Sequence, residues 1–70
     1  MTLQETLDFA DMSACMAVDQ QEAWGDLHYS IDNYRENIRT TLQDCGVPEF
    51  EQEAFKAFNA KIKTLCGWER

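Results

Sequence analysis

Lys and Arg are absent from the first 34 of this chain's 70 residues, and the first of them is Arg35. A secretory signal peptide needs a positively charged start followed by a hydrophobic segment. The longest apolar run, residues 14–18, is too short for such a segment and far too short to span a bilayer. We therefore expect a cytoplasmic protein that does not bind membranes.

Cysteine and histidine are also scarce. Cys15, Cys45 and Cys66 are an odd number at irregular spacing, unlike the paired cysteines of a secreted disulfide scaffold, and no CxxC spacing occurs. A zinc site needs three or four convergent ligands, and the chain has a single His. We expect buried free thiols, no metal site and no cofactor.

Residue patterns that support catalysis are missing as well. No Ser or Thr has His and Asp at a recognised spacing, and there is no glycine-rich phosphate loop. The carboxylates fit exposed helix faces, where solvent leaves them poorly suited to acid–base chemistry. We predict that the protein is not an enzyme and has no catalytic residues.

Proline occurs once, glycine three times, and no segment alternates as a strand does. With a hydrophobic fraction of 44%, the chain is too apolar for intrinsic disorder. We predict one all-α domain over residues 1–70, with three helices at about residues 3–18, 20–45 and 48–66.

The boundary between the first two helices is the least certain. Thr2 and Glu5 have the spacing of a capping box, and Asp19 repeats that signal three residues before an acid. A break near Asp19 is therefore expected. Fusion into one long helix and a break at Gly25 are the alternatives.

The second helix has the clearest pattern. Its apolar residues recur at steps of three and four: Trp24, Leu27, Ile31, Tyr34, Ile38, Leu42 and Cys45. Gly46 and Pro48 end it and start the third helix, whose apolar face carries Ala54, Phe55, Phe58, Ile62 and Leu65. The short link predicts an antiparallel hairpin of helices 2 and 3 as the frame, with helix 1 packed against it.

Helix 1 carries two apolar faces. One consists of Leu3, Leu7, Ala10, Ala14, Ala17 and Val18, and nearly opposite lie Phe9, Met12 and Met16. A helix packed on a hairpin needs one apolar face, so something must cover the other. We favour homodimerisation through Phe9, Met12 and Met16. The alternatives are that helix 1 is wedged between other elements, with Phe50 or Trp68 folded over it, or that a different protein binds there.

The formal charge of −7 lies entirely in residues 1–34, which hold seven acids and no base, whereas residues 35–70 hold six of each. Six of these acids form two groups at helical steps, about 5.4 Å per turn: Glu5, Asp8 and Asp11, then Asp19, Glu22 and Asp26. Nucleic acids and anionic membranes would repel them, so we expect no direct nucleic-acid binding. We predict instead that they engage a basic partner protein.

Two interpretations of the acidic half compete. A run of charge is commonly a solvated face that keeps a small protein soluble. The sharper hypothesis, which the charge segregation supports, is a nucleic-acid mimic whose carboxylates take the places of phosphates on a nucleic-acid-binding protein. We predict a non-enzymatic regulator or inhibitor, and size and charge alone suggest a bacteriophage source. The alternative is an adaptor or co-chaperone whose hairpin binds an amphipathic helix of a client.

Overall fold

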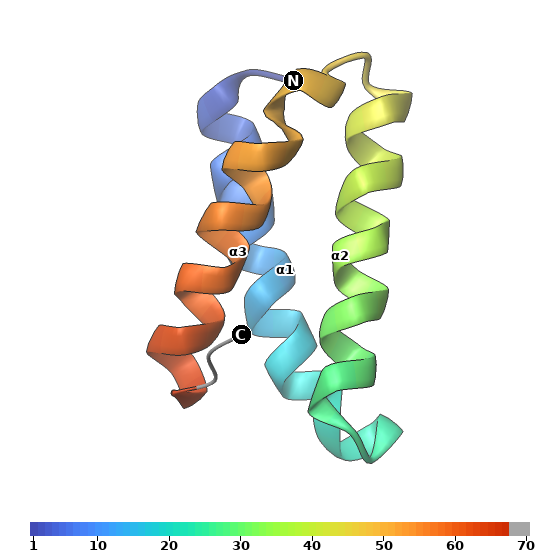
Figure 1. Cartoon of the computed structure of the whole chain (residues 1–70), viewed down its shortest axis with the longest axis vertical. Helices are drawn as coiled ribbons and strands as arrows, with labels where there is room; N and C mark the ends of the chain where they lie inside the picture. Colours follow the sequence, from blue (N-terminus) through green and yellow to red (C-terminus); the bar gives the residue numbers. More distant parts are fainter. Residues whose placement is uncertain (68–70) are drawn as a thin grey trace.

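The computed structural model describes residues 1–67, except for the side chains of Glu22 and Trp24. Three α-helices and one short 3₁₀ turn account for this part of the chain, and it contains no strand: α1 (Leu3–Trp24), α2 (Leu27–Asp44), η1 (Pro48–Phe50) and α3 (Glu51–Cys66). In Figure 1, α1 and α3 run in one direction and α2 runs in the other, in a body 33 Å long. The all-α prediction with three helices is confirmed.

Helix α1 lies between the other two. It packs extensively against both α2 and α3, which contact each other far less (Figure 1). Helix α1 is thus wedged between two elements, but this does not cover its second apolar face, because Met12 and Met16 stay exposed. The helix 2–helix 3 hairpin is not confirmed as the frame of the fold.

Small side chains on its inner face allow α1 this central position. The residues buried there are Thr6, Ala10, Ser13, Ala14 and Ala17. Helices approach each other closely where the side chains between them are short. Close approach is evident at Ser30 of α2, whose hydroxyl donates a 2.6 Å hydrogen bond to the backbone carbonyl of Ala17. This inner face is thus shaped for contact with two neighbours at once.

The first helix ends at Gly25, and the predicted break near Asp19 is wrong. Gly25 has φ 70°, the left-handed conformation that glycine adopts without strain. Asp26 then caps α2 by accepting the backbone N–H of His28 at 2.9 Å. Asp19 stays inside α1 with its side chain exposed. A capping signal alone does not end a helix when no residue nearby has to leave the helical conformation.

The other helix ends follow the sequence signals closely. The Thr2–Glu5 capping box is present, and Gly46 and Gly67 both have positive φ just beyond α2 and α3. Pro48 begins the 3₁₀ turn η1, so α3 starts at Glu51, three residues later than expected.

The core consists of aliphatic and aromatic side chains of α2 and α3 packed around the alanines of α1: Ile31, Ile38, Leu42, Ala54, Phe58 and Ile62. Two residues expected on apolar stripes, Cys45 and Leu65, are exposed at the ends of their helices. All three cysteines are free, as expected, but the prediction that they are buried is wrong for Cys45 and Cys66 and only half met by Cys15. Trp68 lies outside the described residues.

Candidate functional site: the outer face of α1

Five exposed residues form one line along α1 on the side away from the core. We call them the outer stripe: Glu5, Asp8, Met12, Met16 and Asp19. They follow one another at steps of three, four, four and three residues, which keeps them on one face of an α-helix. Carboxylates thus lie at both ends of the stripe and two methionines lie between them.

The two methionines are accessible to solvent. The exposed fraction is 63% for Met12 and 45% for Met16. Phe9, predicted to share their surface, is instead half-buried and packs against the core. Because α1 has two helical neighbours, its buried arc reaches Phe9, so the surface position expected for Phe9 is only partly met and its role in a contact stays a prediction. The apolar part of the site is therefore the Met12–Met16 pair.

Glu5 has a structural role at the start of the stripe. Its carboxylate accepts the backbone N–H of Thr2 at 2.8 Å, and the Thr2 hydroxyl accepts the backbone N–H of Glu5 at 3.1 Å. The hydrogen bond from the Thr2 backbone, with that of the Thr2 side chain, lowers the pKa of Glu5. This carboxylate is held ionised, but it is committed to the helix cap.

The remaining α1 acids with described side chains are less constrained. Asp8 accepts a 3.0 Å hydrogen bond from the Gln4 side-chain amide, a neutral partner. Asp11 lies beside the stripe, and the carboxylates of Asp11 and Asp19 have no hydrogen-bond or ion-pair partner among the described residues. Asp8, Asp11 and Asp19 are therefore the carboxylates that can accept contacts from outside the molecule.

The second predicted acidic group does not form a single surface. Asp26 lies beyond the helix break and caps α2, so it is separated from Asp19 by the turn at Gly25. The Glu22 side chain is outside the described part. The prediction of a continuous Asp19–Glu22–Asp26 face is wrong at Asp26, because the sequence interpretation ended the first helix too early.

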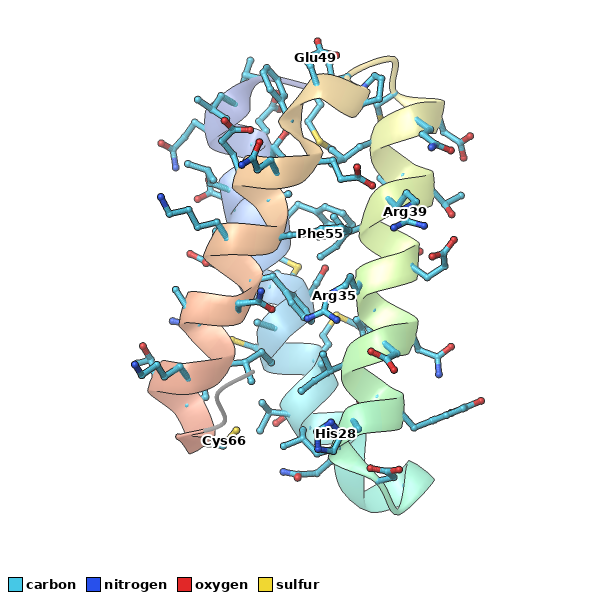
Figure 2. All side chains as sticks on the ribbon, viewed as in Figure 1. His28, Arg35, Arg39, Glu49, Phe55 and Cys66 are labelled. Atoms are coloured by element: carbon cyan, nitrogen blue, oxygen red, sulfur yellow. The ribbon has the colours of Figure 1, made fainter. Side chains whose placement is uncertain are left out.

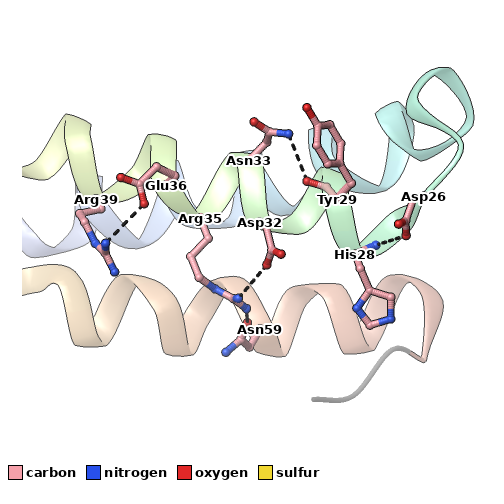
Figure 3. A network of polar contacts seen from close by, with 9 residues as sticks. All are labelled: Asp26, His28, Tyr29, Asp32, Asn33, Arg35, Glu36, Arg39 and Asn59. Atoms are coloured by element: carbon pink, nitrogen blue, oxygen red, sulfur yellow. Dashed lines mark hydrogen bonds and ion pairs between the residues drawn. The ribbon is translucent and has the colours of Figure 1, made fainter.

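The two arginines of the described part lie on α2 and are tied to neighbours on α2 and α3. Arg35 donates to Asn59 of α3 at 2.9 Å and pairs with Asp32 at 3.4 Å (Figure 3). Figure 2 shows Arg35 and Phe55 in the space between α2 and α3, and the Arg35 guanidinium lies 5.9 Å from the ring centres of Phe55 and Phe58.

Arg39 makes a similar but more exposed set of contacts. It pairs with Glu36 at 3.4 Å, as Figure 3 shows, and with Glu51 of α3 at 2.9 Å. In the part of the chain that the structure describes, no ion pair joins an α1 acid to a base. Within this part, the carboxylates of Asp8, Asp11 and Asp19 are consequently not neutralised by a base.

Sequence reasoning missed the role of Arg35. Its side chain is only 14% exposed, against 70% for its ion-pair partner Asp32. The signal that could have found it is its position on α2 directly after Tyr34 on the apolar stripe, where a long side chain can lie along the neighbouring helix.

Residues 1–67 contain neither a metal-binding cluster nor a membrane-spanning helix. No group of three or more His, Cys, Asp or Glu side chains is placed to hold a metal ion. Within the same residues, no helix has the length and apolar character required to cross a bilayer.

No protein-family model, curated protein or solved structure matches this chain.

Proposed function

We propose that the protein is a non-enzymatic regulator or inhibitor that binds a basic partner protein through the outer face of α1. The observation that carries this proposal is the set of exposed carboxylates Asp8, Asp11 and Asp19 on a helix without a single base. Complementary charge speeds association and selects among partners. A partner whose basic groove normally holds nucleic acid is one form of this proposal, in which the carboxylates act as a nucleic-acid mimic.

The oligomeric state and source stay predictions. A homodimer through Phe9, Met12 and Met16 would now rest on Met12 and Met16 alone, since Phe9 packs on the core. A bacteriophage origin and a cytoplasmic location rest on sequence arguments alone.

The adaptor alternative has less support. It needs the surfaces of α2 and α3 that face each other to accept a client helix. Arg35 occupies part of that space by bonding to Asn59 and stacking on two phenylalanines. A client would have to displace these contacts.

Two triple variants with equal net charge test the proposal. The first is Asp8→Asn, Asp11→Asn and Asp19→Asn, and its control is Asp44→Asn, Glu49→Gln and Glu53→Gln, which neutralises exposed carboxylates on α2, η1 and α3. Glu5 is left intact because its loss would disturb the helix cap. Partners captured by wild-type protein from a lysate of the source cells would be identified by mass spectrometry and then purified for titration.

We expect the purified partner to be basic, to bind the control variant like wild type, and to bind the α1 variant at least about ten-fold more weakly. Raising salt from about 50 to about 200 mM should weaken wild-type binding roughly ten-fold, because the contacts are charged and exposed. Competition by DNA or RNA would support the mimic. Equal loss in both variants, or affinity that salt leaves unchanged, would contradict binding through α1.

A further inference from the structure

The outer stripe has a definite order of chemistry. Along one face of α1 it reads acid, acid, methionine, methionine, acid, in the residues already defined as the stripe. Asp8 and Asp19 are eleven residues apart, which at the α-helical rise places their Cα atoms about 16 Å apart. Met12 and Met16 lie between them, one turn from each other.

Contact with an apolar surface would remove Met12 and Met16 from water. The neighbouring acids restrict which apolar surfaces can bind there. An unbranched thioether side chain adapts to partners of different shape. A chain that covers Met12 and Met16 also removes water from the neighbouring carboxylates of Asp8 and Asp19. That loss is costly unless the covering chain brings cations to the same places.

A second copy of this protein does not meet this requirement. If two α1 helices paired in parallel, Asp8 would face Asp8 and Asp19 would face Asp19. If they paired antiparallel, Asp8 would face Asp19. Either arrangement brings like charges together, and α1 has no base to separate them.

The spacing also selects the secondary structure of the partner. Two side chains about 16 Å apart on a strand would be five residues apart and so would point to opposite faces. On a helix, residues at the spacing of Asp8, Met12, Met16 and Asp19 share one face. A helix laid along α1 can therefore match all four positions at once.

We infer that the outer stripe binds a basic amphipathic helix, with apolar side chains on Met12 and Met16 and a Lys or Arg near Asp8 and near Asp19. This inference rests on the proposed function and adds the partner's secondary structure and register. It also replaces the expected homodimer as the occupant of this face.

The test uses three synthetic helical peptides of equal net charge. The first carries Lys, Leu, Leu and Lys at the spacing of Asp8, Met12, Met16 and Asp19. The second replaces both Leu residues with Gln, and the third has the composition of the first with the two Lys residues moved to the opposite face. Protein labelled at its methionine methyl groups is titrated by NMR, and Met1, the one methionine off the stripe, is the internal reference.

We expect the first peptide to shift the Met12 and Met16 methyl signals, to leave Met1 unmoved, and to bind at least about ten-fold more tightly than the other two. The Met12→Ala, Met16→Ala variant should lose that advantage. A matched variant, Leu3→Ala with Leu65→Ala, removes exposed apolar side chains elsewhere and should keep it.

The outcomes separate the inference from the proposed function. Binding lost in the α1 acid variant, together with equal affinity for the first two peptides, would overturn the apolar contact on Met12 and Met16. Equal affinity for the first and third peptides would overturn the helix register. Either result would leave recognition of a basic partner intact. Binding of the first peptide that survives neutralisation of Asp8, Asp11 and Asp19 would contradict both. Methyl shifts of Met12 and Met16 that depend on protein concentration alone would assign the face to a second copy. No shift with any peptide at millimolar concentration would also overturn the inference.

Discussion

The two sides of this bundle use charge differently. On the side formed by α2 and α3, Arg35 and Arg39 each contact a carboxylate, and each also bonds to a residue of the other helix. On the outer face of α1, the carboxylates of Asp11 and Asp19 have no partner among the described residues. Charges of the first kind help to hold helices together. Charges of the second kind make no such contact among the described residues, so they are open to the solvent or to a partner.

The same contrast exists within α1. Its inner face consists of short, buried side chains and its outer face of exposed ones. The inner face is therefore constrained by packing and the outer face is open to change. Three predictions on the stability of the protein test these contrasts.

The largest effect is expected when a small residue on the inner face is enlarged. Ala10→Leu places three extra carbon atoms where Ala10 is fully buried between packed helices. Overpacking of this kind costs about 3 kcal/mol of the free energy of unfolding. The same change at exposed Ala23, near the end of α1, should stay within about 0.5 kcal/mol. Urea titration followed by circular dichroism measures both, and equal effects would mean that α1 is not central in solution.

A smaller effect is expected at Arg35. Arg35→Ala removes the hydrogen bond to Asn59, the pairing with Asp32 and the stacking on Phe55 and Phe58. We expect a loss of about 2 kcal/mol. Arg39→Ala, one turn along α2, removes more exposed pairs and should cost at most about 1 kcal/mol. If the two variants were equally stable, the contacts of the largely buried Arg35 side chain would not help to hold α2 and α3 together.

The sequence predicted correctly those features of the fold that depend on a few neighbouring residues along the chain. The Thr2–Glu5 cap and the glycine after α2 need only neighbouring residues, and both are found as expected. It did not predict the burial of side chains whose neighbours come from other helices. Phe9 is half-buried because α1 has two packing partners, and Arg35 is covered by side chains of α3. Neither fact is contained in the periodicity of a single helix.

The candidate site likewise has some features that follow from a single helix and one that depends on where that helix ends. The acidic character of α1 and the exposure of Met12 and Met16 follow from the order of residues along one helix. Whether Asp19 and Asp26 share a surface depends on where that helix ends. Two signals competed there, and the left-handed glycine rather than the capping acid marks the end of α1.

The smallest effect concerns Glu5, the one acid of the outer stripe that serves the fold. Its pKa is lowered by the hydrogen bond from the Thr2 backbone, so the folded state favours its ionised form. The stabilisation of the first turn is therefore complete above the ordinary pKa of glutamate, about 4.3, and is lost as the pH falls through the lowered value. We expect the Thr2 amide signal in NMR to titrate with the Glu5 carboxylate and its exchange protection to fall in acid. In Glu5→Gln the amide oxygen still accepts the Thr2 N–H but does not titrate, so the acid dependence should vanish. A Glu5 midpoint at or above the ordinary value would show that this cap is open in solution, and Glu5 would then join Asp8 and Asp19 as a carboxylate available to a partner.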